Sequence, residues 1–109
     1  MAGKLGDYIV EYRYRVDPIH RERLLTLLGQ IRSYVLDLGL SAFEVWTQDE
    51  DPWTVIELHA YDSWSHFQRV AQKPSEPEMD KVYDELDRLI EGGLAATQRA
   101  TWAPTSLPK

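Results

Sequence analysis

Aromatic side chains make the most suggestive pattern for chemistry in this sequence. Tyr12 and Tyr14 stand two residues apart in the segment 7–16, and Trp64 and Phe67 stand three apart in a later one. If the two segments pack together, the rings line an apolar pocket for a flat ligand, and the phenols offer it hydrogen bonds. A filled aromatic core explains the same residues equally well, so both interpretations stay open.

His66 is the first candidate for acid–base chemistry. Its imidazole could act as a general base toward an acidic phenol or enol, or as an axial haem ligand. Helical spacing places it off the face of Trp64, Phe67 and Val70, which favours an ordinary surface histidine. The candidate catalytic residues are His66 and Tyr61, and the candidate ligand-binding residues are Tyr12, Tyr14, Trp64 and Phe67.

Glu57 and His59 are a second polar pair, two residues apart on one predicted strand. A carboxylate and an imidazole on one strand face could begin a metal site. No third ligand stands at a recognisable spacing, so we expect no metal. A buried ionic network with Arg13 at a subunit contact explains the same residues.

Other chemistry is limited by what the chain lacks. It has no cysteine, no G-x-S-x-G elbow, no phosphate-binding glycine loop and no H-E-x-x-H pair, and we expect no cofactor, neither haem nor flavin. The 18 acidic residues outnumber the 12 basic ones, giving a net charge of -6 that disfavours nucleic acid as a partner.

Hydrophobic periodicity and turn residues predict the elements that must position these side chains. They are a strand over 7–16, a helix from Pro18 to Gly39, a hairpin of strands 41–48 and 53–61, a helix from Asp62-Ser63 to before Pro74, a helix over 79–90 and a weak strand over 95–103.

This order predicts an α+β fold with the ferredoxin-like βαββαβ arrangement, in which helices cover one side of a four-stranded antiparallel sheet. We expect one domain over residues 1–109, with a core over 7–103 and a loose tail over 104–109. The amino terminus has no apolar stretch of signal-peptide length, and no run of about 18 apolar residues occurs. A cytoplasmic protein without membrane insertion is expected.

The other side of the predicted sheet has no cover, and two or more large Trp side chains there would be unusual on a monomer. Pairing with a second sheet would bury them, with Arg13 meeting Glu44 and Glu57 between subunits. The residues that we place on this side are Ile9, Ala42, Trp46, Trp53 and Val55, mixed with Glu11, Arg13, Glu44, Glu57 and His59.

Several short segments, in order, resemble the dimeric α/β-barrel superfamily of the antibiotic biosynthesis monooxygenase (ABM) type. The resemblance covers roughly residues 7–103 and is especially close to the soluble ABM-like domain at the carboxyl terminus of some bacterial major-facilitator-type efflux proteins. The segments are Tyr14-Arg15-Val16-Asp17-Pro18, Phe43-Glu44-Val45-Trp46, Asp51-Pro52, Glu57 and Asp62-Ser63-Trp64.

The resemblance implies a homodimer whose sheets face each other, with an apolar pocket between sheet and helices in each subunit. It also suggests two functions: a cofactor-independent monooxygenase acting on a small, apolar, aromatic molecule, or a non-catalytic ligand-sensing or interaction module. The chain departs from the described active sites, because it contains no Asn and has Val70 and Ala71 where many members have a histidine.

Overall fold

The computed structural model describes residues 6–108, so the first five residues and Lys109 lie outside the description. Its elements follow the predicted order, with a short 3₁₀ turn before the first helix and another before the last strand. They are β1 (Tyr8–Arg15), η1 (Pro18–His20), α1 (Arg21–Leu38), β2 (Ala42–Thr47), β3 (Thr54–Tyr61), α2 (Trp64–Ala71), α3 (Pro77–Leu89), η2 (Leu94–Ala96) and β4 (Gln98–Trp102).

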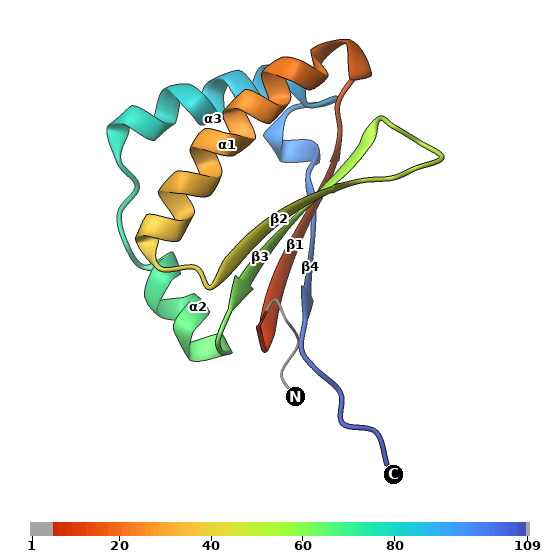
Figure 1. Ribbon diagram of the computed structural model, residues 1–109. Coiled ribbons are helices and arrows are strands. Elements are labelled where there is room, and N and C mark those ends of the chain that lie inside the picture. Colours follow the sequence, from red (N-terminus) through yellow and green to blue (C-terminus); the bar gives the residue numbers. More distant parts are fainter. Residues whose placement is uncertain (1–5, 109) are drawn as a thin grey trace.

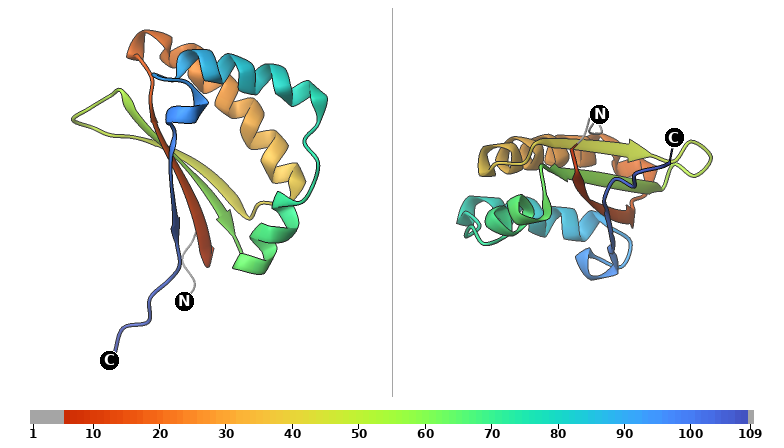
Figure 2. Two further views of the ribbon diagram at one scale, coloured as in Figure 1. Left: turned by 180° about the vertical axis from the view of Figure 1, so that it is seen from behind. Right: turned by 90° about the horizontal axis from the view of Figure 1, so that it is seen from below.

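The four strands form one antiparallel sheet in the order β2-β3-β1-β4. Figures 1 and 2 show the helices on one side of this sheet, with α1 and α3 side by side and α2 near the end of β3. The predicted α+β ferredoxin-like fold is confirmed. Because β1 is central, its helix-facing side chains lie at the middle of the covered face.

Alternation in β1 sorts its side chains between the two faces, as the sequence predicts. Val10 and Tyr14 are buried on the helix side, whereas Arg13 and Arg15 are exposed. Helix α1 covers the sheet with a continuous stripe of buried residues, namely Leu24, Leu27, Leu28, Ile31 and Val35.

Local capping sets the ends of this helical segment. The Asp17 side chain accepts a hydrogen bond from the Ile19 amide at 3.0 Å and begins η1, with Pro18 in its first turn. Gly39, with φ of 121°, ends α1, and its amide donates to the carbonyls of Val35 and Leu36. The predicted helix therefore starts as a 3₁₀ turn.

The structure corrects the faces assigned to three residues of β3. Val55, Glu57 and His59 lie on the helix-covered face and not on the open one, because they stand opposite the helix-facing residues of β1. Arg13 therefore cannot meet Glu57. Its nearest acidic partner is Glu11, at 3.4 Å, on the same strand.

Two element boundaries also differ from those predicted. The predicted strand over 95–103 includes part of η2, so β4 begins only at Gln98, and residues 103–108 contain no regular secondary structure. Helix α3 starts at Pro77, two residues before the predicted helix over 79–90. Proline fits the first helical turn because that turn needs no amide donor from it.

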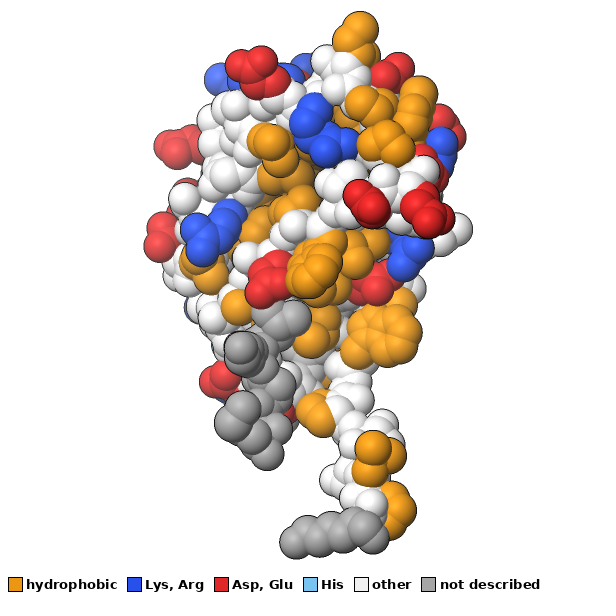
Figure 3. All heavy atoms as spheres, turned by 45° about the vertical axis from the view of Figure 1, so that its right-hand side comes forward, with side chains coloured by type: hydrophobic (Ala, Val, Ile, Leu, Met, Phe, Trp, Pro, Cys, Tyr) orange, Lys and Arg blue, Asp and Glu red, His pale blue; other side chains and the backbone are white. Residues whose placement is uncertain are grey.

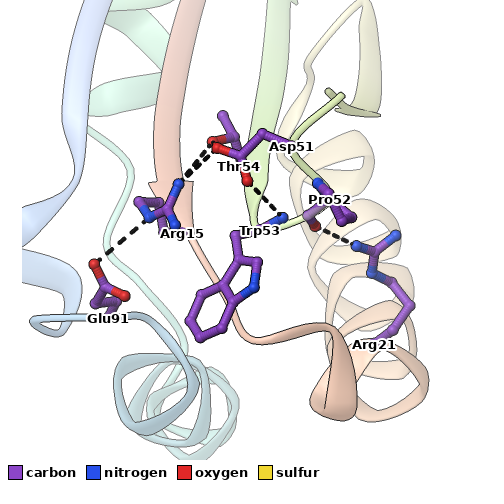
Figure 4. A network of polar contacts seen from close by, with 7 residues as sticks. All are labelled: Arg15, Arg21, Asp51, Pro52, Trp53, Thr54 and Glu91. Atoms are coloured by element: carbon purple, nitrogen blue, oxygen red, sulfur yellow. Dashed lines mark hydrogen bonds and ion pairs between the residues drawn. The ribbon is translucent and has the colours of Figure 1, made fainter. Parts of the chain in front are cut away.

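A polar cluster fastens the β2–β3 turn to β1 (Figure 4). Arg15 donates to Asp51 at 2.7 Å, lies 3.5 Å from Glu91, and its guanidinium stacks 5.4 Å from the Trp53 ring. Asp51 also accepts from the Thr54 hydroxyl at 2.8 Å. Because the arginine and its acids are partly exposed, this cluster positions the turn more than it stabilises the fold.

The open face of the sheet is largely apolar. Figure 3 views the side away from α1 and α3, where apolar side chains gather among separate charged groups. Trp46 and Trp102 are each 56% exposed. A hollow of about 310 Å³ beside Trp46 is bordered by Arg13 and Ile56. The remaining apolar residues of this face, by register, are Ile9, Ala42, Leu58, Ala60 and Ala100.

Replacing Leu27 with alanine should lower the free energy of unfolding by about 2–5 kcal/mol, because this side chain is 1% exposed and its loss leaves a cavity. Leu25→Ala, in the same helix at a position that is 55% exposed, should cost less than about 0.5 kcal/mol. Urea unfolding followed by circular dichroism measures both. Equal losses would contradict the orientation of α1.

Candidate functional site

A cavity of about 240 Å³ lies between the sheet and the carboxyl-terminal helical segments. Strands β1 and β3 supply its polar floor, while α3, η2 and the residue before β4 supply its walls. The lining residues are Tyr12, Tyr14, Glu57, His59, Tyr83, Leu86, Leu94 and Thr97. A hydrophobic enclosure with a few convergent polar groups is the usual form of a small-molecule site.

The carboxylate of Glu57 is the centre of the polar floor. It is 6% exposed and accepts a hydrogen bond from the Tyr14 hydroxyl at 2.5 Å and one from His59 Nε2 at 2.9 Å. Each carboxylate oxygen therefore has one donor, which offsets part of the cost of removing the charge from water. The three residues form a single chain, Tyr14–Glu57–His59.

Tyr14 is held as a neutral donor in this chain. Burial raises the pKa of its hydroxyl well above the ordinary value, and the negative charge and hydrogen bond of Glu57 raise it further. Tyr14 therefore donates a hydrogen bond to the carboxylate and stays protonated. Its role is to hold one oxygen of Glu57 in place and to stabilise the carboxylate charge.

His59 occupies the reactive end of the chain. A carboxylate only accepts hydrogen bonds, so Nε2 of His59 carries a proton and, in the neutral ring, Nδ1 carries the lone pair. The Tyr12 and Phe43 rings pack against the imidazole in steeply inclined, edge-type arrangements, at centroid distances of 4.8 and 5.0 Å. This is the arrangement of an oriented general base beside a cavity.

Two further polar groups face the cavity. Burial, followed by the charge of Glu57, raises the pKa of Tyr83 to about 12, so its phenol stays protonated at neutral pH. The Thr97 hydroxyl oxygen is buried and has no hydrogen-bond partner within residues 6–108. A buried hydroxyl without a partner is costly, and a polar group of a ligand would satisfy it.

The sequence-predicted ligand residues fall into two groups. Tyr12 and Tyr14 line the cavity. Phe67 packs against Tyr61, with their ring centroids 5.1 Å apart, and neither is among the lining residues. Trp64 is 56% exposed and does not line the cavity either. The structure therefore brings together half of the predicted aromatic set.

Helix α2 is turned about its axis relative to the sequence prediction. The His66 side chain is only 13% exposed, whereas Trp64 is exposed. His66 Nδ1 accepts from the Asp62 amide at 2.9 Å, and Nε2 lies 2.8 Å from the Gly39 carbonyl oxygen. Both nitrogens are engaged by the backbone, so His66 joins the end of α1 to the start of α2 in this structure.

Sequence reasoning found some cavity residues and missed others. The sequence singles out Glu57 and His59 as a polar pair, but the face expected for them, together with Val55, is wrong, because only the register with β1 shows which face the helices cover. Tyr83 and Thr97 were not identified as site residues. No local pattern distinguishes them, because their role arises only when α3 and β4 pack beside β1.

Within residues 6–108, no group of three or more His, Asp or Glu side chains is placed to hold a metal ion. No helix of the same region combines the length and the apolar composition that a membrane span requires.

No protein-family model matches the chain, and no curated protein matches it in sequence. Solved structures do match its fold. A candidate antibiotic biosynthesis monooxygenase from Deinococcus radiodurans is 13% identical with a TM-score of 0.67, and the match covers 94% of this chain and 96% of that one. A candidate protein of the same kind from Nitrosomonas europaea is 10% identical with a TM-score of 0.69, and the match covers 95% of each chain.

A conserved protein from Methanosarcina mazei shares the fold with a TM-score of 0.70 and 12% identity, covering 93% of this chain and 95% of that one. At such low identities these likenesses establish the fold alone. Membership of the ABM-type superfamily and the similarity to efflux-associated domains both stay predictions.

Tyr14→Phe should lower the free energy of unfolding by about 1.5–3 kcal/mol, because it removes a hydrogen bond to a buried carboxylate. Tyr34→Phe is the matched control. Its hydroxyl accepts only an exposed bond from the Glu76 amide, and the loss should stay below about 0.5 kcal/mol. Urea unfolding at pH 7 compares the two variants. An unchanged free energy of unfolding in Tyr14→Phe would show that Glu57 does not depend on this donor.

Proposed function

We propose that this protein is an ABM-like homodimer that binds a small, flat phenolic or enolic molecule in the cavity and oxygenates it without a cofactor. The observation that carries the proposal is the buried Glu57–His59 pair on the cavity floor. Such a pair is the minimum machinery for taking a proton from an acidic hydroxyl in an apolar enclosure.

The proposed first step is a proton transfer to His59. The ligand hydroxyl gives its proton to Nδ1, while the Nε2 proton stays hydrogen-bonded to Glu57. The carboxylate stabilises the imidazolium that forms, and the imidazolium in turn stabilises the ligand anion. Tyr14 keeps the carboxylate in place throughout because its own proton is not released.

The ligand anion then supplies the electrons for the reaction with molecular oxygen. In the simplest balance, the enolate carbon keeps one of the two methylene hydrogens of the keto form and reacts with one molecule of dioxygen. With the proton returned by His59, the adduct gives a carbonyl group and one molecule of water. One oxygen atom enters the product, and the other leaves as water with the two methylene hydrogens. The protein needs to provide only the base, the hydrogen-bond donors and a cavity that excludes water.

The names of the fold neighbours agree with this proposal but do not carry it, because one fold supports many activities. The alternative, a ligand-sensing module, needs the same cavity without turnover. Only the oxygenase consumes oxygen after the ligand has bound, so a measurement of ionisation and oxygen uptake distinguishes the two.

The homodimer is proposed from the open sheet face. It exposes two tryptophans and carries a row of aliphatic side chains, which a monomer seldom leaves in water. Helices already cover the opposite face, so the same face of a second copy is the simplest cover. The cavity lies on the helix side, and the proposed dimer leaves it open.

We expect bound 4-nitrophenol, whose anion is coloured, to ionise at a pH about one unit lower than in water, because His59 takes its proton. His59→Gln should remove this shift, and His20→Gln, on exposed η1, should retain it. Absorbance titration at saturating protein measures the shift. Proton transfer to His59 would be contradicted if 4-nitrophenol bound to the parent protein ionised at the same pH as in water, or if the lower ionisation pH persisted in His59→Gln.

The same proteins should consume one molecule of oxygen per anthrone oxidised, in an oxygen electrode, at rates that fall about 100-fold in His59→Gln. Anthrone contains a methylene that its carbonyl group activates, and loss of one methylene hydrogen gives the enolate. Ionisation and binding without enzyme-dependent oxygen uptake would contradict the oxygenase and support the ligand-sensing module.

Ile56→Asp should convert the dimer to a monomer, because it places a charge in the middle of the open face beside Trp46. Ile19→Asp, the same change at a position that is 81% exposed, should leave the dimer intact. Light scattering after gel filtration at micromolar concentration measures the mass, and circular dichroism confirms folding. A monomeric parent protein, or a dimeric Ile56→Asp protein, would rule out this interface.

A further inference from the structure

We infer that the ligand is an aromatic hydroxy acid, with its hydroxyl in the cavity near Thr97 and its carboxylate at the mouth on Arg99. The inference deepens the proposed function and rests on it. It follows from two residues on the same side of the chain, Thr97 just before β4 and Arg99 within it. Among residues 6–108, the Thr97 hydroxyl has no hydrogen-bond partner and Arg99 has no carboxylate partner.

Arg99 stands beside the cavity on the helix-facing side of the sheet. It is the register partner of Tyr12, which lines the cavity, and its guanidinium carbon lies 5.6 Å from the centroid of the Phe67 ring. The aromatic ring holds the cation by a cation–π contact and leaves the planar N–H groups for another partner.

No carboxylate within residues 6–108 forms an ion pair with Arg99. Its charge nevertheless acts on the neighbourhood of the cavity. Burial and the nearby Tyr12 raise the pKa of Tyr61 to about 12, and the positive charge of Arg99 opposes that rise. Arg99 is therefore an electrostatic neighbour of the aromatic wall, with fork-shaped donors suited to a carboxylate.

Thr97 lies two residues before Arg99 on the same side of the chain, and its buried hydroxyl oxygen lacks a partner among the described residues. Two residues of strand advance the backbone by about 6.6 Å, so the two side chains leave the chain on the same side and at neighbouring positions. A hydroxyl at one end of a benzene ring can satisfy Thr97 while a carboxylate at the other end pairs with the longer Arg99 side chain.

The charges inside the cavity fix the direction of the ligand. Glu57 is buried on the floor, and a second carboxylate beside it would be repelled and would carry its own desolvation cost. The carboxylate is therefore directed outward to Arg99, and the hydroxyl inward toward His59 and Thr97. The net charge of -6 cannot attract an anion, so selectivity for an acid depends on this local cation.

Isothermal titration calorimetry with three probes tests both contacts. The parent protein should bind 4-hydroxybenzoate at least about fivefold more tightly than the neutral 4-hydroxybenzamide, through a charge-assisted pair. Arg99→Gln should remove this preference and leave amide binding unchanged. Thr97→Val, which keeps the shape, should weaken the preference for 4-hydroxybenzoate over benzoate, because only His59 then meets the hydroxyl.

Arg32→Gln is the control, since it removes one positive charge from an exposed position on α1. It should retain the preference for the acid. Equal binding of acid and amide by the parent protein, or an unchanged ratio in Arg99→Gln, would overturn the inference and leave the phenol-binding proposal standing. Failure of all hydroxyl-bearing probes to bind would instead count against the proposed function itself.

Discussion

The buried carboxylate of Glu57 is the constraint on which the rest of the site depends. A carboxylate that is only 6% exposed stays charged only if hydrogen-bond donors reach it. Here Tyr14 donates from the neighbouring strand, and His59 donates from the same strand. Tyr14 is diagonal to Glu57 across the β1–β3 pair, and His59 is two residues along β3. The polar chain thus depends on the sheet register.

A slip of one residue between β1 and β3 would turn Tyr14 and Glu57 to opposite faces and leave the carboxylate with only one of its two donors, His59. The hydrophobic alternation of both strands opposes the same slip, so packing and polar satisfaction favour one register. The cavity results from this arrangement, because side chains that serve Glu57 do not fill the space above them. Leu86 and Leu94 close the walls and keep the environment apolar.

Most of the fold could be predicted because its elements are encoded locally. Alternation identified the strands, the Asp17-Pro18 pair and Gly39 marked the limits of the first helical segment, and the element order indicated the ferredoxin-like topology. The failures have a physical origin in packing between distant elements. Alternation groups Glu57 and His59 with Val55 on one face of β3 but does not show which face the helices cover. The expected open face was wrong because these residues stand opposite the helix-facing residues of β1.

Helix α2 shows the same limit at the scale of one turn. Its sequence allows either Trp64 or His66 to face the body, and hydrophobicity alone selects the tryptophan. The imidazole faces inward because the Gly39 carbonyl and the Asp62 amide supply both of its hydrogen bonds, and neither belongs to the helix. Likewise, Tyr83 and Thr97 become site residues only after α3 and β4 reach β1.

The two faces of the central strand separate the proposed tasks of the protein. Residues of β1 alternate between the cavity and the open face, so Tyr12 and Tyr14 can serve a ligand while Ile9 and Arg13 face the proposed partner. Backbone hydrogen bonds join the two sets, but their side chains do not touch across the sheet. Substitutions on the cavity face can therefore change the ligand that is bound without altering the proposed subunit contact. This separation is consistent with a fold that this chain shares with proteins only 10–13% identical to it.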